Sequence, residues 1–395
     1  MADRLNESPE ENVKDQLGGR LRVGVVGCGV IAQVMHLNYL WELSDRFEIA
    51  ALCDVSEPTA RACAARYGVS AVYTDWRDLV AQRLDLVMVL TSGSHAPIAV
   101  AAAQAGSHVF VEKPMCLSLA EGKQMLEAAR KAGVRLMVGT MKRYDPAYER
   151  LLDLMPLEDL RLVCVTTLES PMHPYIQAYP LTAMTPPPAD VLAELRADDE
   201  RRLAEALPDA DAEARYCYRW MLLDNLVHEF NMLRGVLGEP DRVYQARLGR
   251  TVCDITLGFG PTEVHVSWVD LPGLAHYKQE LAFYALDRRV TLTLPSPYLR
   301  GMPSLLTVEG GDRGTPHGTR TLEVMSYDEA FKRELVELDD AIRSGREPRT
   351  NAIDGLHDVA LCAAVARSHL TRAQVDSPTA LPGWADSHLP EAVLT

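Results

Sequence analysis

Short apolar runs alternate with helix-like amphipathic stretches over the first third of the chain. The runs read LRVGVV, FEIAALC, LDLVMVL, HVFV and RLMVG, and several of the stretches between them end at a glycine. Glycine supplies the positive φ that a helix C-terminus often adopts. Near-continuous apolar strands separated by helices are typical of a parallel sheet that is covered on both faces. The pattern predicts a doubly wound α/β domain over residues 20–145.

The pattern changes after residue 145. Strand-like runs follow one another with few helices between them, as LRLVCVTTLE, TVCDITLGF, EVHVSWV, QELAFYAL and RVTLTL. They predict an α+β domain with a large, mostly antiparallel open sheet over residues 146–372. Residues 171–215 are rich in proline and charge, and we interpret them as a surface insertion that is a lid, an oligomer arm or merely tolerated. Residues 1–19 are predicted to be a disordered tail and residues 373–395 a C-terminal tail.

The composition of the chain excludes some classes of binding partner. The 395 residues are 47% hydrophobic with a net charge of −15, which is ordinary for a globular protein and unfavourable for binding nucleic acid or anionic membrane. The first nineteen residues have no apolar signal region, and no run is long enough to span a membrane. Eight cysteines without a CxxC pair predict reduced thiols rather than a metal site. We expect a cytoplasmic protein without a metal.

A glycine-rich turn follows the first apolar run. The segment Gly27-Cys28-Gly29-Val30-Ile31-Ala32 has the GxGxxA spacing and opens a helix. Gly27 permits the tight turn and Gly29 lets the backbone approach a pyrophosphate. The N–H groups of the first helical turn, including those of Val30 and Ile31, would face that anion. The turn therefore predicts a Rossmann-type dinucleotide site.

The second apolar run ends in ALCD, which places Asp54 at the carboxyl end of the second strand. A carboxylate there accepts hydrogen bonds from the adenosine ribose and repels a 2′-phosphate. No lysine or arginine follows before Arg61, so the sequence favours NAD over NADP. The alternative is that Asp54 is only a turn residue in DVSEP.

Lys113 stands at the end of the fifth apolar run, in HVFVEKPM. Ligands of doubly wound sheets bind outside the carboxyl ends of the strands, so its amine is expected in the crevice. Pro114 restricts the backbone of Lys113, and burial would lower the lysine pKa toward neutrality. The alternative is a surface lysine in a loop.

An acid–base pair is predicted further along, in WMLLDNLVHEFNMLRGVLG. Asp224 and His228 are four residues apart on a helical pattern, so they would share one face. An aspartate that orients a histidine base is a common catalytic arrangement. The alternative is a core histidine satisfied by its aspartate.

Over residues 20–372 the chain resembles the Gfo/Idh/MocA family of NAD(P)-dependent sugar dehydrogenases. The likeness is carried by VGVVGCGVIAQVMHLNYL, TSGSHAPIAVAAAQAGSHVFVEKPM, VGTMKRYDPAYERL, DNLVHEFNMLRGVLGEP and SGREPRTNAIDGLHDV. The resemblance implies a two-domain enzyme whose active site lies in the cleft. By this likeness Lys113 would bond the substrate hydroxyl, His228 would take its proton and Asp224 would steady the assembly.

The same resemblance implies further contacts. Ser92, His95 and Glu112 match positions that line the cofactor in relatives, while Arg143 and Tyr144 match a stretch near the substrate. The sequence departs from the family around the DxxxH pair. It reads YCYRWMLLD where relatives often have a glycine run, Leu226 where they have a glycine, and Asn231 where they have an acid. These departures concern the substrate side.

We therefore expect an NAD-dependent oxidoreductase acting on a CH–OH group of a sugar, cyclitol or glycoside, which it would oxidise to a ketone. Two alternatives stay open: redox-neutral glycoside cleavage with a retained NAD, and a non-catalytic nucleotide-sensing regulator. The resemblance also implies a homo-oligomer, a dimer or tetramer, formed through the C-terminal sheet.

Overall fold

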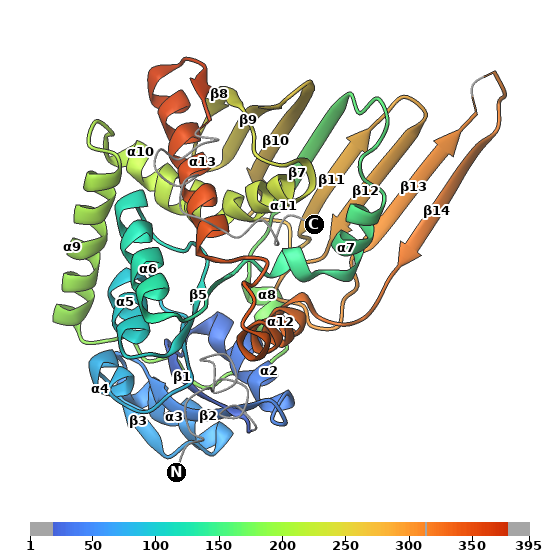
Figure 1. Ribbon diagram of the computed structural model, residues 1–395. Coiled ribbons are helices and arrows are strands. Elements are labelled where there is room, and N and C mark those ends of the chain that lie inside the picture. Colours follow the sequence, from blue (N-terminus) through green and yellow to red (C-terminus); the bar gives the residue numbers. More distant parts are fainter. Residues whose placement is uncertain (1–18, 313, 378–395) are drawn as a thin grey trace, which may run out of the picture.

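The computed structural model describes residues 19–312 and 314–377, which form two β-sheets with helices packed against them (Figure 1). Residues 1–18 and 378–395, most of the two predicted tails, lie outside the described part of the chain. Among the described helices, none combines the length and the apolar character needed to cross a membrane.

The first sheet confirms the predicted doubly wound domain. Six parallel strands stand in the order β3-β2-β1-β4-β5-β6. They are β1 (Leu21–Val26), β2 (Phe47–Cys53), β3 (Ala71–Tyr73), β4 (Leu86–Val89), β5 (His108–Glu112) and β6 (Leu136–Gly139). Every residue of β4 and β6 is buried, as the continuous apolar runs require. The strand order reverses between β1 and β4, so a ligand crevice is expected at their carboxyl ends.

Helices pack on both faces of this sheet. They are the π-helix η1 (Ala32–His36), which continues into α2 (Leu37–Glu42), and α3 (Glu57–Tyr67), α4 (Trp76–Val80), α5 (Ala96–Gln104) and α6 (Leu119–Ala132). Ser118 caps α6 by accepting the Glu121 N–H at 3.3 Å, and α6 ends at Gly133 with φ +70°. These bonds satisfy backbone groups that a helix end leaves without partners.

The second sheet is the predicted large and mostly antiparallel one. Its order is β14-β13-β12-β11-β7-β10-β9-β8-β15, and of these neighbours only β7 and β10 run parallel. The strands are β7 (Leu162–Glu169), β8 (Arg242–Arg247), β9 (Val252–Phe259), β10 (Thr262–Asp270), β11 (Lys278–Tyr284), β12 (Arg288–Leu294), β13 (Leu305–Gly311), β14 (Gly318–Val324) and β15 (Val375–Asp376). Because β15 pairs with β8, the sheet extends past residue 372, where the tail was predicted to begin.

The remaining helices connect the two sheets. They are the 3₁₀ helix η2 (Met141–Tyr144), α7 (Pro146–Asp153), the π-helix η3 (Cys217–Leu226), α11 (Val227–Leu237), α12 (Ala330–Ser344) and α13 (Ala352–Thr371). Helix α12 falls within the range predicted for the second domain. Its apolar side chains nevertheless join the core on the η1 and α2 face of the first domain, through Phe331, Leu335, Leu338 and Ile342.

The predicted insertion, residues 171–215, contains α8 (His173–Ile176), α9 (Ala189–Ala206) and α10 (Ala212–Tyr216). Helix α9 stands beside α5 and α6 of the first domain (Figure 1), and an ion pair between Arg202 and Glu121 joins α9 to α6. Only Leu203 of α9 is buried, so polar contacts rather than a core hold this helix in place.

Candidate active site

The glycine-rich turn has the conformation that the sequence predicts. Gly27 has φ +101°, and a Cβ at this position would lie 2.7 Å from the backbone of Leu90, so a side chain is excluded. Gly29 differs, because nothing lies within 4 Å of where its Cβ would be. The helical segment begins at Val30, immediately after this open space. The turn thus leaves room for a pyrophosphate against the first helical N–H groups.

Asp54 has two structural bonds beside its predicted cofactor role. Its carboxylate accepts the Cys28 N–H and the Ser56 N–H, each at 2.8 Å. A carboxylate has about four acceptor sites, so it can still accept ribose hydroxyls. The nearest downstream cations are already engaged, since Arg61 pairs with Glu57 and Arg66 donates to the Pro180 carbonyl. This arrangement favours NAD over NADP.

We predict that Asp54→Ala weakens NAD about ten- to hundredfold, the usual cost of a lost charge-assisted hydrogen bond. NADP should lose less, because the repulsion of its 2′-phosphate disappears. Titration of both dinucleotides by fluorescence measures the ratio. Asp54→Asn is the control, since it removes the charge and keeps an acceptor oxygen. An unchanged NAD to NADP ratio in Asp54→Ala would mean that Asp54 only shapes the turn.

Two residues predicted to line the cofactor are buried and have hydrogen bonds inside the protein, and their cofactor contact stays a prediction. Glu112 is 6% exposed, and its carboxylate binds His36 Nε2 at 2.6 Å and the Lys113 N–H at 3.0 Å. His95 is 1% exposed and bonds the Thr91 carbonyl at 2.7 Å, and burial lowers its pKa. Ser92 is exposed after β4, so its predicted contact stays a prediction.

Behind Glu112 lies a buried group of titratable side chains. His36 is fully buried and packs edge-on against Phe110 and Phe331, with ring centroids 5.3 and 5.5 Å away. Glu334 of α12 is also fully buried, and neither of its carboxylate oxygens has a hydrogen-bond partner. Burial raises the pKa of Glu334 well above its ordinary value, and nearby Glu112 adds to the rise. Burial therefore favours the protonated form of Glu334 in the folded protein.

We predict that Glu334→Gln stabilises the fold by about 1–3 kcal/mol at pH 8 and hardly at all at pH 4. The folded-state pKa of Glu334 lies above the unfolded value, so folding takes up a proton and stability falls as pH rises above about 4.5. Glutamine has no proton to lose, so the variant should not lose stability as pH rises. Urea unfolding at pH 4 and pH 8 measures the free energy of unfolding of both proteins. Glu337→Gln on the same helix, where Glu337 pairs with Arg346, is the control. Equal gains at both pH values would contradict the prediction.

The structure brings Lys113 and Asp224 together, although 111 positions separate them. Lys113 Nζ donates to the Asp224 carbonyl at 2.8 Å and to its carboxylate at 3.3 Å. The lysine side chain is 20% exposed and the aspartate 38%, so both reach the crevice. Burial lowers the pKa of Lys113, but Asp224, Glu112 and Tyr298 outweigh burial and the net pKa is raised. The predicted lowered pKa is therefore wrong, and Lys113 is an ammonium at neutral pH.

His228 lies close enough to Lys113 and Lys142 for both to act on its charge. Its pKa is well below the ordinary value because of burial, with smaller effects of Lys142 and Lys113, so the ring is neutral. His228 Nδ1 has no hydrogen-bond partner, while the Asp224 carboxylate binds Lys113. The predicted orienting bond from Asp224 to His228 is therefore corrected. The chain changes from the π-helix η3 to α11 between them, so the expected four-residue alignment of an α-helix does not hold.

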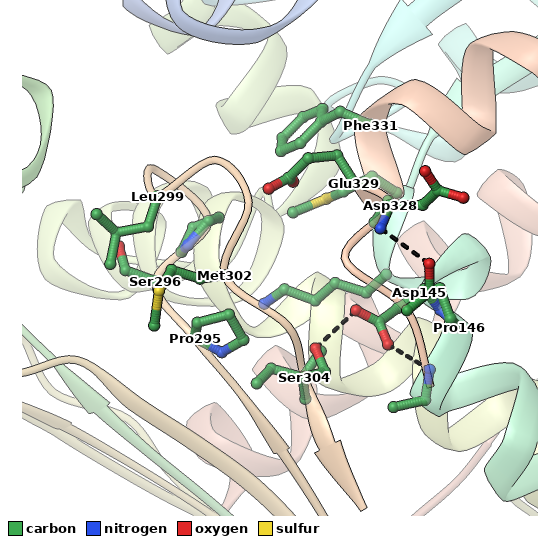
Figure 2. A pocket seen from close by; sticks show the side chains of 17 residues that line it. Asp145, Pro146, Pro295, Ser296, Leu299, Met302, Ser304, Asp328, Glu329 and Phe331 are labelled. Carbon is green, nitrogen blue, oxygen red and sulfur yellow. Dashed lines mark hydrogen bonds between the residues drawn. The ribbon is translucent and has the colours of Figure 1, made fainter. Parts of the chain in front are cut away.

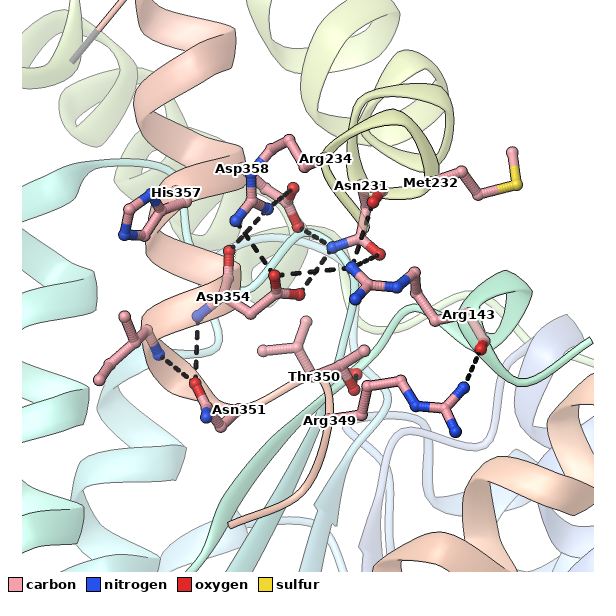
Figure 3. Close-up of polar contacts among 12 residues, drawn as sticks. Arg143, Asn231, Met232, Arg234, Arg349, Thr350, Asn351, Asp354, His357 and Asp358 are labelled. Carbon is pink, nitrogen blue, oxygen red and sulfur yellow. Dashed lines mark hydrogen bonds and ion pairs between the residues drawn. The ribbon is translucent and has the colours of Figure 1, made fainter. Parts of the chain in front are cut away.

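The predicted substrate residues Arg143 and Tyr144 both have structural partners, and their contact with substrate stays a prediction. Arg143 donates to the carbonyl of Asn231 at 3.2 Å and pairs with Asp354 at 3.7 Å (Figure 3). Tyr144 is 2% exposed and its hydroxyl bonds Thr350 at 2.9 Å. Both residues tie η2 to the segment that opens α13.

Asn231, where relatives often have an acid, belongs to the same cluster. Its amide nitrogen donates to Asp354 and to Asp358, each at 2.8 Å (Figure 3). An acid here would add a third carboxylate and supply no donor at neutral pH. Arg234 contributes the main positive charge, at 2.5 Å from Asp358 and 3.1 Å from Asp354. The departure at Asn231 is thus structural rather than part of the substrate site.

Lys142 is the site residue that sequence reasoning missed. Its amine donates to Gln279 at 2.6 Å, and Gln279 in turn donates to Glu229, which also accepts from Thr167. Burial lowers the pKa of Lys142 to about 8, against the opposing effect of Glu229. Lys142 follows the carboxyl end of β6 as Lys113 follows β5, so the rule that selected Lys113 could have found it.

Loops of the second sheet form the other wall. Tyr298 is near enough to Lys113 and Asp224 to interact with both charges, and burial raises its pKa. A cavity next to Lys142 is lined by Pro295, Ser296, Ser304 and Glu329, among others (Figure 2). The cavity measures about 40 Å³, which holds a few waters and no sugar ring.

No cluster of three or more metal-ligating side chains occurs among the residues that the structure describes. The first sheet is parallel and its strand order reverses between β1 and β4. The glycine turn is open, and a carboxylate holds the lysine amine at the crevice. Together these features define a two-domain dinucleotide-dependent oxidoreductase.

Comparison with known proteins gives the same class. Residues 21–140 match the family described as "Oxidoreductase family, NAD-binding Rossmann fold". That family model is named GFO_IDH_MocA, and the matched residues correspond to the first sheet and its helices. Myo-inositol 2-dehydrogenase of Thermotoga maritima is 26% identical over 346 residues, 85% of this chain and 92% of that protein. D-apiose dehydrogenase of Paraburkholderia graminis is 36% identical over 132 residues, 33% of this chain and 35% of that protein.

The fold as a whole also has solved counterparts. A levoglucosan dehydrogenase in complex with NADH and L-sorbose superposes with a TM-score of 0.69 at 18% identity, covering 91% of this chain and 99% of that one. At this identity the likeness shows the fold. It extends over both sheets, which the family match over residues 21–140 does not.

Proposed function

We propose that this chain is an NAD-dependent dehydrogenase that oxidises a secondary hydroxyl of a sugar, cyclitol or glycoside to a ketone. The observation that carries the proposal is the Lys113 amine, bonded to Asp224 at the carboxyl end of β5. Parallel sheets of this class bind the dinucleotide outside those strand ends, so the amine lies where the reacting oxygen would be. A protein that only binds nucleotide has no need for this arrangement.

In this proposal the three site residues have different tasks. Lys113, as an ammonium, donates a hydrogen bond to the substrate oxygen. His228 is neutral and accepts the hydroxyl proton. Asp224 binds Lys113 and keeps it charged. The C–H bond of the carbinol breaks with both electrons, and the O–H proton leaves to the imidazole, so atoms and electrons balance.

NAD, when bound, would accept the hydride at its nicotinamide ring. Gly29, Val30 and Ile31 would hold its pyrophosphate, and Asp54 its adenosine ribose. The open space at Gly29 fits this group.

The polar side chains near Lys113 support a polyhydroxy substrate. Lys142, Tyr298 and Glu169 are near one another or near Lys113, and each can hydrogen-bond a hydroxyl. Relatives named for myo-inositol and D-apiose also support a polyhydroxy substrate.

The test uses a panel of cyclitols, aldoses and glycosides, including substrates deuterated at the carbinol carbon. With NAD present, the expected result is NADH formation that is slower for the deuterated compound, with the label appearing in NADH. If no panel member forms NADH, and none is consumed in the reverse direction with the matching ketones, the proposal fails.

A second candidate is redox-neutral glycoside cleavage, in which the hydride returns to the substrate after elimination. This candidate is favoured by the inserted segment, which contacts several parts of the chain around the dinucleotide crevice. Such contacts would help to retain the cofactor. Release of aglycone without net NADH would support it. The nucleotide-sensing regulator remains the third reading, disfavoured by the Lys113–Asp224 pair.

The cytoplasmic location and the homo-oligomer remain predictions. Apolar side chains are exposed on outer strands of the second sheet, at Tyr244, Val252, Leu322 and Val324. They support association through this sheet, as a dimer or tetramer.

A further inference from the structure

The inserted segment makes hydrogen bonds with both domains along its length. We name residues 175–202 the strap. Near its start, the Tyr175 hydroxyl accepts the Tyr277 N–H and the Tyr179 hydroxyl accepts the Arg300 N–H, both at 2.8 Å. The Arg300 guanidinium also lies 4.4 Å from the centre of the Tyr179 ring. These bonds fasten the strap to the loops on the substrate side.

The strap next meets the glycine-rich turn. Thr182 donates to Gln33 Oε1 from its backbone and from its hydroxyl, each at 2.8 Å. Gln33 is 3% exposed, and its amide nitrogen donates to the Cys28 carbonyl at 2.9 Å. Gln33 thus bridges the strap to the backbone that would hold the pyrophosphate.

A third set of contacts lies on α3, the helix that follows Asp54. The Thr185 N–H donates to Thr59 at 2.9 Å, and the Thr182 hydroxyl is 3.4 Å from Cys63 Sγ. Arg66 of the same helix donates to the Pro180 carbonyl. The strap therefore runs along the adenosine end of the crevice.

The last contacts are made by α9. The Asp199 carboxylate would lie 2.9 Å from a Cβ at Gly93, in the loop after β4. Arg202 pairs with Glu121, at the start of the helix that follows β5, and Ser94 bonds the same glutamate. The strap and α9 thus contact the loop after β4 and the helices that follow β1, β2 and β5.

We infer that the strap holds a bound dinucleotide in its crevice, and that NAD or NADH leaves only when the strap separates from α3. The dinucleotide lies outside these same strand ends, so the strap crosses its exit. Nothing lies within 4 Å of where a Cβ of Gly29 would be, so the strap does not fill the space next to this glycine. No residue of the strap is fully buried, although Ile176, Tyr179 and Leu181 pack, partly buried, against the core of the first domain. Segments with few buried side chains are the ones that open locally.

This inference rests on dinucleotide binding and not on the proposed substrate. It predicts that cofactor release is slow and that strap opening sets its rate. A dehydrogenase would then be limited by NADH release, whereas a redox-neutral reaction would continue with the strap closed.

The test crosslinks the strap to α3. Thr182→Cys places a second thiol beside Cys63, where the side-chain atoms are now 3.4 Å apart. After oxidation by a small-molecule disulfide, mass spectrometry verifies the 63–182 bond. NADH release, followed by fluorescence with excess NAD as competitor, should slow by about a hundredfold or more and return to the wild-type rate on reduction. The double variant Thr182→Cys/Cys63→Ser cannot crosslink and should not respond to oxidant.

A second variant works in the opposite direction and needs no crosslink. Arg202→Ala/Tyr179→Phe removes two anchors that do not face the cofactor, and should speed NADH release about tenfold. The matched control is Arg201→Ala on the same helix, because Arg201 pairs only within α9, with Asp198 and Glu205. Unchanged release in the crosslinked protein, or in the double anchor variant, would overturn the inference.

Mixing the crosslinked protein with substrate distinguishes a failure of the proposed function from a failure of the inference about the strap. A dehydrogenase should form one equivalent of NADH in a burst and then continue only at the slowed release rate, whereas a redox-neutral enzyme should keep cleaving at an unchanged rate. If neither reaction occurs, the proposed function fails, while the release rates still decide whether the strap retains the cofactor.

Discussion

Lys113→Met should lower turnover by a factor of about 10²–10⁴, the range of a lost general acid–base group, while NADH still binds. Methionine keeps the apolar stem and removes the ammonium that would bind the substrate oxygen. The Asp224 carboxylate, 38% exposed, can turn to water, so the fold should be preserved. Single-turnover rates measure the chemical step, and fluorescence titration measures NADH binding. Turnover within threefold of wild type would exclude the proposed role of Lys113.

Asp224→Asn is the companion variant. Asp224 is the largest of the influences that raise the pKa of Lys113, so its removal should move that pKa downward. The Lys113 contact with the residue-224 carbonyl does not depend on the side chain, so the amine should stay in place. We expect a smaller loss of rate than in Lys113→Met, together with an alkaline limb of the pH–rate profile at lower pH. A merely structural aspartate would leave that limb unmoved.

Arg234→Met should destabilise the fold by about 3–5 kcal/mol, the usual effect of removing one partner from a buried ionic group. The Arg234 side chain is 3% exposed and pairs with Asp354 and Asp358 (Figure 3). It also pairs with Glu239. Methionine would leave these carboxylates without their main cation. Because α11 also carries His228, we expect activity to fall with the loss of structure.

The loss should depend on pH. Burial raises the pKa of Asp358, and Arg234 acts against that rise, so the variant raises it further. A raised folded-state carboxyl pKa costs stability above the unfolded pKa, so the deficit of Arg234→Met should shrink as pH falls toward 5. Urea unfolding at pH 5 and pH 8 measures this change. Arg346→Met, which removes a half-exposed partner of Glu337, should cost at most about 1 kcal/mol. Similar losses in the two variants would contradict the cluster's role.

Some local signals were reliable and others were not. Asparagine is a common residue before a helix, and α13 begins after Asn351, whose side chain accepts the N–H groups of Ile353 and Asp354. The three-residue spacing of Ser326 and Glu329 resembles the capping box of Ser118 and Glu121, yet Glu329 accepts the Gly301 N–H from a distant loop. A cap needs only its own helix, whereas a distant donor can compete for the same carboxylate.

The sequence alone determined the parallel domain, the glycine turn and the position of Lys113 at a strand end. These depend on local hydrophobic period, backbone sterics and the handedness of strand–helix–strand connections, which neighbouring residues set. Only the tertiary structure decided that Glu112 faces His36, that Asp224 binds Lys113 rather than His228, that Lys142 joins the site and that the insertion crosses the crevice. Each of these depends on which distant backbone a side chain meets, and contacts across more than fifty residues leave no period in the sequence.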